Sequence, residues 1–247
     1  MKFKEFGNRE LPTIIFLHGG GLSWWSMEKI IKDFSSENHV VAPIIDGHGE
    51  DGKTNFISID DSADKLISFI DANCGGRVFA LVGLSIGAQI ITEILSRRSD
   101  ITKFAVIESA LVYPIKGTRF LAVPTYKMFY GLIKKKWFSK LQGKILNVPE
   151  EMFERYYKDS LNITKESLVN ITLSNGNYIL KNTIKNTKAK VLIIVGEKEL
   201  KIMKKSAEEL HNTILNSHLY IAKKMGHGEL SLVNYEEYVS LIRNFFV

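Results

Sequence analysis

A serine between two glycines is the first group in this chain whose surroundings suggest chemistry. Residues 83–87 are Gly-Leu-Ser-Ile-Gly, which places Ser85 in a Gly-x-Ser-x-Gly pattern. A strand-like run at 77–82 precedes this pattern, and an apolar helix-like run at 86–95 follows it. A tight strand-to-helix turn lifts the serine hydroxyl above a sheet, and glycines are needed beside it because a Cβ would clash there. The pattern therefore predicts that Ser85 is a nucleophile.

A second glycine turn predicts the groups that would stabilise negative charge. Residues 16–21, Phe-Leu-His-Gly-Gly-Gly, end the first strong strand-like run. The amide of Gly20 is expected to donate to an oxyanion, together with the amide of Ile86 at a helix amino terminus. A phosphate-binding loop is the alternative, but Leu22 stands where its lysine would follow the last glycine.

A nucleophilic serine needs a base, and His227 is the best placed of the six histidines. It lies in Met-Gly-His-Gly at 225–228, between the last strand-like run and the last helix-like run. This position puts it at the carboxyl edge of the sheet, where Ser85 is also expected. The other histidines suit structural roles: His18 in the glycine turn, His48 in a polar turn, His39 and His218 at strand starts, and His211 at a helix end.

The base in turn needs a carboxylate that orients it and stabilises its protonated form. Residues 195–200 are Val-Gly-Glu-Lys-Glu-Leu, where a strand-like run ends in two glutamates. Glu199 is the preferred candidate because it lies deeper in the loop, just before a helix. Glu197 and Glu108, the latter at the end of another strand-like run, remain alternatives.

The elements that must position these residues alternate between strand and helix along the chain. Apolar runs separated by helical patterns indicate a mostly parallel sheet with helices on both faces, an α/β fold. The expected strands cover 13–17, 40–42, 77–82, 104–107, 191–195 and 218–221. The expected helices cover 25–34, 59–72, 86–95, 201–211 and 235–246.

Residues 110–180 interrupt this alternation. They hold 11 of the 26 aromatic residues of the chain and show helical patterns at 126–132 and 150–158. We expect an inserted helical cap here, over the carboxyl ends of the strands, with 1–109 and 181–247 forming the core. Some aromatic side chains could line a substrate pocket, although packing serves them equally well: Trp24, Trp25, Tyr126, Phe129, Tyr130, Trp137, Tyr156 and Tyr157.

The positive charge of the chain is concentrated in the same segment. Residues 110–180 contain 11 Lys and Arg against 5 Asp and Glu, which equals the net charge of +6 of all 247 residues. No nucleic-acid-binding motif accompanies these residues, so a nucleic acid partner is not expected. A basic face suits anionic substrates or a lipid surface, and it also suits ordinary solvated lysines.

Cysteine content and hydropathy point to the cytoplasm. Cys74 is the single cysteine, so the chain can form no internal disulfide, and no cysteine cluster predicts a metal site. The amino terminus lacks the pattern of a secretory signal. The longest uncharged runs, 11–27 and 78–92, are shorter than the ~18 apolar residues of a membrane span and contain glycines.

The order Ser85, Glu199, His227 and five motifs together resemble the α/β-hydrolase superfamily. The motifs are the glycine turn at 18–20, the loop at 46–49, the serine turn at 83–87, the acid loop at 196–199 and the base loop at 226–228. The resemblance implies a sheet of about eight strands, a cap inserted after the sixth strand, and no cofactor. Two departures are the glutamate where the family usually has aspartate, and Asp-Gly-His-Gly-Glu-Asp at 46–51 in place of Pro-Gly-x-Gly-x-Ser.

These residues predict a serine hydrolase that cleaves a carboxylic ester of a small, largely apolar substrate through an acyl-enzyme. The same groups also serve thioesterases, lactonases and hydrolases of carbon–carbon bonds, so these alternatives stay open. Dehalogenases and epoxide hydrolases of this superfamily are disfavoured, because they carry aspartate in place of Ser85. A member that binds a ligand without turnover is the alternative from another class. The sequence sets no oligomeric state.

Overall fold

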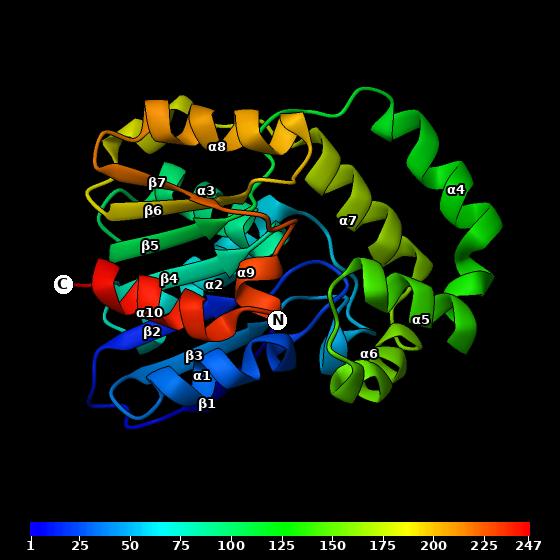
Figure 1. Ribbon diagram of the computed structural model, residues 1–247, viewed down its shortest axis with the longest axis horizontal. Coiled ribbons are helices and arrows are strands. Elements are labelled where there is room, and N and C mark those ends of the chain that lie inside the picture. Colours follow the sequence, from blue (N-terminus) through cyan, green and yellow to red (C-terminus); the bar gives the residue numbers. More distant parts are fainter.

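The computed structural model describes residues 1–247, with every side chain except that of Arg119. Its centre is a seven-stranded sheet in the order β1-β3-β2-β4-β5-β6-β7 (Figure 1). β1 runs antiparallel to β3, and the other neighbouring pairs are parallel. The strands are β1 Lys2–Phe6, β2 Thr13–Leu17, β3 His39–Ile44, β4 Val78–Leu84, β5 Thr102–Glu108, β6 Lys190–Gly196 and β7 Ser217–Ala222.

The mostly parallel α/β sheet is confirmed, but it has seven strands where the resemblance implied about eight. The six strands expected from apolar runs are all present, as β2 to β7. Only one strand, β1, precedes β2, so the antiparallel part of the sheet consists of this strand alone. Its sequence, Lys-Phe-Lys-Glu-Phe, lacks an apolar run because an edge strand is half exposed, and charged side chains there discourage pairing with other chains.

Helices cover both faces because the inner strands are apolar on both sides. In β2, Ile14 and Phe16 pack against α1 and α10, whereas Ile15 and Leu17 pack on the opposite face against α2, α3 and α8. Successive side chains of a strand point to opposite faces, so one run of sequence supplies two cores. The helices are α1 Glu28–Phe34, α2 Ile59–Asn73, α3 Ile86–Arg97, α8 Lys201–Thr213 and α10 Tyr235–Phe245.

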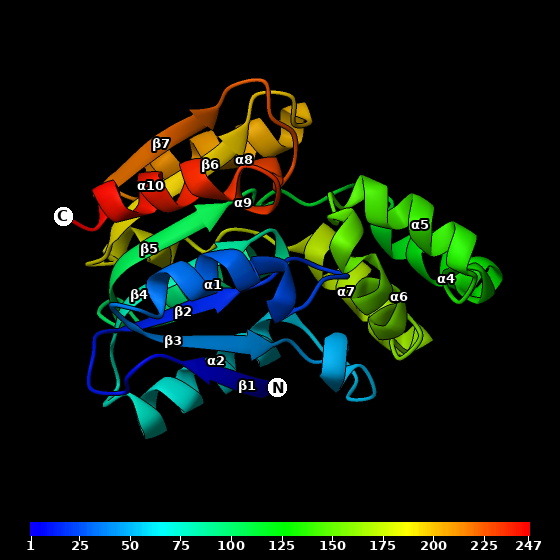
Figure 2. The same cartoon turned by 60° about the horizontal axis from the view of Figure 1, so that its bottom comes forward.

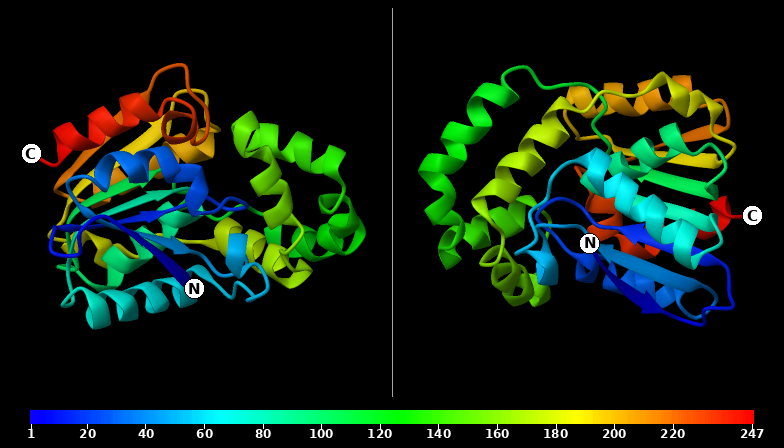
Figure 3. Two further views of the ribbon diagram at one scale, coloured as in Figure 1. Left: turned by 90° about the horizontal axis from the view of Figure 1, so that it is seen from below. Right: turned by 180° about the vertical axis from the view of Figure 1, so that it is seen from behind.

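Four helices lie beyond the carboxyl ends of the parallel strands (Figures 1 and 2). They are α4 Thr118–Ile133, α5 Lys136–Ile145, α6 Phe153–Ser160 and α7 Lys165–Asn177. Figure 3 shows that α7 lies nearest the sheet and that α4 lies farther out. Helix is therefore present in both places where residues 110–180 predicted it, whereas α5 and α7 were not expected. Across residues 1–247, no helix combines the length and the apolar character that a bilayer span requires.

The loop after β3 uses its additional acidic residues to hold its own shape. Asp46 is fully buried and forms an ion pair with Lys65 of α2. Burial opposes ionisation of Asp46, but the hydrogen bonds and charges of Lys65 and of the Met1 amino group together outweigh this and lower the pKa of Asp46. Asp51 accepts a hydrogen bond of 2.8 Å from the Thr54 hydroxyl. These contacts give a structural role to Asp46 and Asp51 in the loop that departs from the family pattern.

Candidate active site

Three distant segments bring Ser85, His227 and Glu199 into one hydrogen-bonded row. Ser85 lies between β4 and α3, Glu199 follows β6, and His227 follows β7, before the short helix α9 Glu229–Leu232. The Ser85 hydroxyl lies 3.0 Å from Nε2 of His227. Nδ1 of the same ring lies 2.8 Å from the Glu199 carboxylate. All three loops leave the carboxyl edge of the sheet, which is why residues far apart in the chain meet there.

The turn at Ser85 is sharp and strained. Its φ of 55° and ψ of −115° place a serine in backbone space that costs about 1–3 kcal/mol to occupy. A Cβ on Gly83 would lie 2.7 Å from the carbonyl carbon of Gly87, and one on Gly87 would lie 2.5 Å from the oxygen of Leu17. Both neighbouring positions therefore require glycine, and Ser85 is partly exposed between buried residues.

The carboxylate of Glu199 is built into the core. Its side chain is 1% exposed, and its Oε1 accepts hydrogen bonds from the Ser109 hydroxyl at 2.7 Å and the Gly196 amide at 2.8 Å. Burial would raise the pKa of Glu199, but the bonds from His227, Gly196 and Ser109 outweigh it and lower the pKa. Because an ionised carboxylate only accepts, Nδ1 of His227 donates to it. In the neutral ring, Nε2 of His227 then carries the lone pair and accepts from Ser85.

The two alternative acids point elsewhere. Glu197 is exposed and its Oε2 accepts from the backbone amide of Lys224 at 2.7 Å. Glu108 is buried, and its Oε1 faces the amide of Ser231 at 3.4 Å. The geometry therefore favours Glu199 as the partner of His227. Ser109, which orients Glu199, was not anticipated, because its position directly after β5 was its only signal.

Glu108 is a second buried carboxyl beside this row. Burial raises its pKa to about 7, although hydrogen bonds from Ser231 counteract part of this effect. Its Oε2 and the hydroxyl of Tyr238 are both buried without a hydrogen-bond partner among the described residues. The ordinary pKa of this carboxyl is 4.5. The folded protein therefore binds one proton more than the unfolded chain between about pH 4.5 and pH 7.

This difference predicts that Glu108→Gln stabilises the protein at alkaline pH. A pKa raised from 4.5 to about 7 corresponds to about 3 kcal/mol in the free energy of unfolding. The wild type loses this stability as the pH rises from 4.5 to about 7, and it does not regain it at higher pH. Gln keeps the acceptor for Ser231 and has no charge to bury. We expect the variant to gain about 3 kcal/mol relative to wild type between pH 4.5 and pH 8, measured by urea denaturation.

The exposed Glu208 provides a matched control for this prediction. Glu208→Gln should shift the free energy of unfolding by the same small amount at pH 4.5 and at pH 8. A constant difference between Glu108→Gln and wild type at the two pH values would show that Glu108 does not bind this proton.

The two residues expected to form an oxyanion hole are neighbours. Ile86 begins α3, so its amide has no acceptor within the helix. A Cβ on Gly20 would lie 3.7 Å from Cγ2 of Ile86, and Gly20 borders the same cavity as Ser85. His18 supports this turn: it is fully buried, its Nδ1 bonds the Gly19 oxygen at 2.9 Å, and its Nε2 accepts from the amide of Ile45. Burial lowers the pKa of His18 to about 3, so this ring is neutral.

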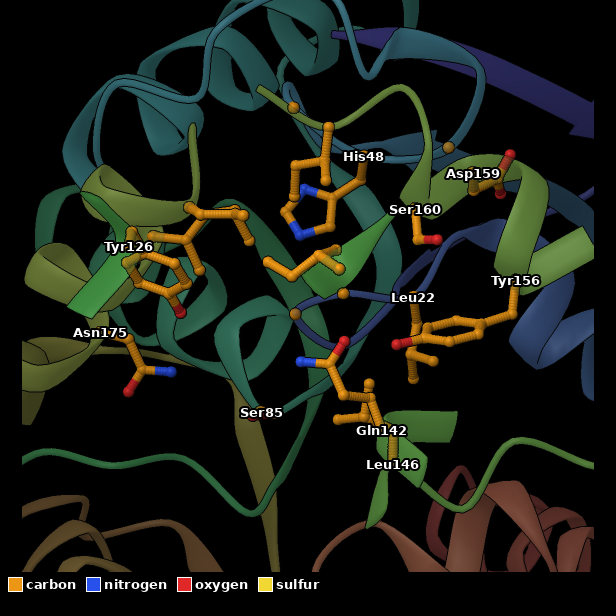
Figure 4. Close-up of a pocket in the computed structure, with 18 residues that line it drawn as sticks. Leu22, His48, Ser85, Tyr126, Gln142, Leu146, Tyr156, Asp159, Ser160 and Asn175 are labelled. Atoms are coloured by element: carbon orange, nitrogen blue, oxygen red, sulfur yellow. The ribbon is translucent and has the colours of Figure 1, made fainter. Parts of the chain in front are cut away.

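Ser85 opens onto a cavity of about 300 Å³ between the core and helices α4–α7 (Figure 4). Its wall contains aliphatic, aromatic and polar side chains. The aliphatic side chains are Leu22, Ile133, Leu146, Ile163, Leu168 and Ile171. The polar and aromatic side chains are His48, Tyr126, Gln142, Tyr156, Asp159, Ser160 and Asn175. In the described part of the chain, no group of three or more His, Cys, Asp or Glu side chains is placed to hold a metal ion.

Some aromatic residues of the 110–180 segment line this cavity or pack within the segment, whereas Phe129 and Trp137 are exposed. Tyr126 and Tyr156 line the cavity, as the sequence allowed. The Tyr130 hydroxyl donates to the oxygen of Ile163, and the Tyr157 hydroxyl donates to the oxygen of Lys134. Trp25 reaches the cavity wall indirectly, because its indole N–H donates to Asp159 at 2.7 Å.

His48 presents an acceptor that nothing in the described protein satisfies. The ring is 2% exposed, its Nδ1 lies 3.0 Å from the oxygen of Asp46, and its Nε2 is buried without a partner. Burial lowers the pKa of His48, so Nδ1 donates to Asp46 and Nε2 keeps its lone pair. Figure 4 shows the ring among the side chains that line the cavity. A buried acceptor of this kind matches a ligand that carries a hydroxyl or an N–H.

Comparison with known structures shows the same fold across the whole chain. An esterase from Exiguobacterium antarcticum superposes with a TM-score of 0.81 at 16% identity, over 99% of this chain and 94% of that one. An enol-lactonase from Burkholderia xenovorans LB400 gives 0.81 at 13% identity, over 99% and 95%. An esterase from Thermogutta terrifontis gives 0.78 at 15% identity, over 99% and 92%. No curated protein sequence matches significantly.

The family assignment rests on sequence. A family model described as serine aminopeptidase S33 matches residues 9–230, which is most of the chain and includes Ser85, Glu199 and His227. The solved structures, all below 25% identity, support the fold alone. Together, the match and the seven-stranded sheet agree with the resemblance inferred from the five motifs. The chain belongs to the serine aminopeptidase S33 family and is a hydrolase of the α/β-hydrolase fold.

Proposed function

We propose that this hydrolase cleaves carboxylic esters of small molecules through an acyl-enzyme on Ser85. The observation that carries the proposal is the row of hydrogen bonds from Ser85 through His227 to the buried Glu199, open to a cavity of about 300 Å³. A serine becomes a competent nucleophile when a base accepts its proton and a carboxylate orients that base.

The reaction follows from these contacts in two stages. Ser85 Oγ attacks the ester carbonyl while Nε2 of His227 takes its proton, and Glu199 stabilises the imidazolium. The amides of Gly20 and Ile86 hold the oxyanion. His227 then protonates the alkoxide as the alcohol leaves, and an acyl-serine remains. Water, deprotonated by His227, attacks this ester, and the carboxylic acid departs with the proton returned to Ser85.

The cavity supports short substrates with a polar group. A volume of about 300 Å³ lies at the small end of the usual range for ligand sites, ~300–1,000 Å³. The aliphatic wall suits a short acyl chain, and the free acceptor on His48 suits a hydroxyl. The esterases among the structural neighbours are consistent with ester substrates for this chain.

A substrate panel tests the proposal. Among p-nitrophenyl acetate, butyrate, octanoate and palmitate, we expect the highest kcat/KM for acetate or butyrate, because longer chains exceed the cavity. Ethyl 3-hydroxybutyrate should exceed ethyl butyrate in kcat/KM if His48 binds its hydroxyl. Butyryl-CoA, a small lactone, a vinylogous diketone and an aminoacyl anilide complete the panel. Turnover of one of these without ester turnover would replace the proposal with the thioesterase, lactonase, carbon–carbon hydrolase or peptidase alternative.

A fluorophosphonate probe separates an enzyme from a binding protein that lacks turnover. We expect covalent labelling at Ser85, identified by mass spectrometry, because only a serine with an activated hydroxyl reacts readily. Absence of labelling in folded protein would favour the binding protein.

A further inference from the structure

Helices α4 and α5 turn large apolar side chains toward solvent. Phe120 is 82% exposed, Met128 73%, Trp137 64% and Ile145 72%. Leu121, Val123 and Leu141 on the same helices are each at least half exposed. Side chains of this size seldom gather on the surface of a protein unless the surface binds something. We call these seven residues, with the exposed lysines between them, the α4–α5 face.

In α5 the usual amphipathic arrangement is reversed. Trp137, Leu141 and Ile145 recur every four residues and so form one stripe, which is exposed. The buried side of this helix instead carries the small residues Ser139 and Gly143. A Cβ on Gly143 would lie 3.6 Å from the Tyr156 ring, so the small residues allow α5 to pack closely against α6. The apolar stripe therefore contributes little to the packing of the protein itself.

Lysines accompany this stripe, and acids are absent from it. Residues 110–149 contain eight basic residues and no Asp or Glu. Lys136, Lys140 and Lys144 form a second stripe on α5, beside the apolar one. A groove of about 640 Å³ is lined by these three lysines and also by Glu150 and Glu154. Among the described residues, Lys136 is the lysine of this stripe that forms an ion pair, with Glu154 at 2.6 Å.

The same two helices also form part of the candidate active site. Tyr126 and Ile133 of α4 and Gln142 of α5 line the cavity that contains Ser85. Figures 2 and 3 show α4 and α5 at the end of the molecule opposite its carboxyl terminus, away from the sheet. A partner that binds the α4–α5 face would therefore contact the outer side of the cavity wall.

We propose that the α4–α5 face docks on the surface of a lipid bilayer that contains anionic lipids. Exposed Trp, Phe and Leu on a helix with lysines beside them match the boundary between headgroups and acyl chains. Each lysine near an anionic surface increases the partition constant onto the membrane about fivefold. Four exposed lysines therefore make a large electrostatic contribution to membrane binding. Apart from Lys136, which is exposed but paired with Glu154, the exposed lysines of the face are Lys127, Lys135, Lys140 and Lys144.

The positive charge of the α4–α5 face favours an anionic lipid surface over a second copy of the chain as its partner. Two copies joined through this face would set one lysine stripe against another, and the acids beside that stripe are Glu150 and Glu154, of which Glu154 already pairs with Lys136. Like charges across an interface disfavour association. Phosphate-rich lipid headgroups supply the negative charge that the face lacks, and the acyl boundary accepts its apolar stripe.

The test is binding to vesicles, which needs no turnover and so is independent of the proposed esterase activity. The full chain is sedimented with vesicles of phosphatidylcholine alone or of phosphatidylcholine and phosphatidylglycerol at 7:3. We expect binding to the anionic vesicles, at least tenfold weaker binding to the neutral ones, and release in 0.5 M NaCl, because salt screens the lysines. The emission of Trp137, the most exposed tryptophan, should shift to the blue, and Trp137→Phe should remove that shift.

Two pairs of variants locate the surface. Lys140→Glu with Lys144→Glu should weaken binding at least ~25-fold, whereas Lys185→Glu with Lys188→Glu changes the net charge equally and should have a small effect. Leu141→Ser should weaken binding about tenfold, whereas Leu215→Ser, at a residue 92% exposed elsewhere, should not. Thermal unfolding confirms that each variant is folded.

Three results would overturn the proposal. The first is no binding to anionic vesicles. The second is equal weakening by both lysine pairs, which would reveal a net-charge effect without a defined surface. The third is a dimer in sedimentation velocity that Leu141→Ser dissociates, which would identify a second copy as the occupant of the α4–α5 face.

Discussion

Ser85→Ala is expected to lower kcat/KM toward a p-nitrophenyl ester by about 10⁴–10⁶-fold. The hydroxyl is the group that would attack the carbonyl, and no other nucleophile occupies its place between His227 and the cavity. Alanine keeps the Cβ and the backbone at φ 55°, so the fold and the strained turn should be unaffected. Initial rates, together with thermal unfolding of both proteins, provide the measurement. Ser36→Ala, at an exposed serine outside the site, is the matched control.

A double variant makes this prediction sharper. If Ser85 and His227 act as one unit, Ser85→Ala combined with His227→Ala should lose no more activity than either single variant loses. Multiplied losses would mean that the two residues act independently, contrary to the 3.0 Å contact between them. Ester turnover that survives in Ser85→Ala would remove the basis of the proposed function.

The second large effect is expected from Glu199→Gln, which should lower kcat by about 10⁴-fold with little change in KM. Glu199 accepts from three donors: the Nδ1 of His227, the hydroxyl of Ser109 and the amide of Gly196. A glutamine must turn its own NH₂ toward one side of this arrangement. If it faces His227, the ring takes the wrong tautomer, and if it faces Gly196, two N–H groups oppose each other. In either case His227 is no longer oriented and its cation is no longer stabilised.

Glu197→Gln and Glu108→Gln are the matched controls, because they make the same chemical change at the two alternative acids. Both carboxylates point away from His227, so each variant should keep kcat within about threefold of wild type. A large loss in Glu108→Gln, with Glu199→Gln nearly normal, would transfer the role of the acid to Glu108. Circular dichroism and thermal unfolding would show that each variant retains the fold.

Local sequence patterns were sufficient to predict the strands that are buried on both faces, because burial makes such a segment apolar throughout. The strands β2 to β7 lie inside the sheet with helices on both sides, so each is a short apolar run that is visible in the sequence. β1 was missed because an edge strand at the surface keeps Lys2 and Glu5. Among the helices, α5 was not predicted although Trp137, Leu141 and Ile145 recur at helical spacing, and Gly, Ser and Asn in α7 blur its pattern. Helical periodicity predicts a buried face, and these two helices do not have a simple one.

The residues of the candidate site also divide into those that a local sequence pattern predicts and those that it does not. The glycines beside Ser85 were predictable because a sharp turn excludes a Cβ, which is a local steric rule that a short motif records. For the acid, the sequence favoured Glu199 by its position in the loop but left Glu197 and Glu108 open, since all three lie where strands end at the same edge. The side chain of Glu199 alone meets Nδ1 of His227, and this depends on how β6 and β7 lie together.

The sequence by itself determined the type of fold, the order of the chemically competent residues and the turn that presents Ser85. These properties follow from local sterics and from the periodicity of burial, which neighbouring residues encode. Only the tertiary structure showed which carboxylate lies against Nδ1 of His227, that Ser109 and Gly196 donate to it, and that α4 and α5 present their apolar residues to solvent. Such contacts join residues separated by tens to more than a hundred positions, and parallel strand packing sets their distances, so no local pattern contains them.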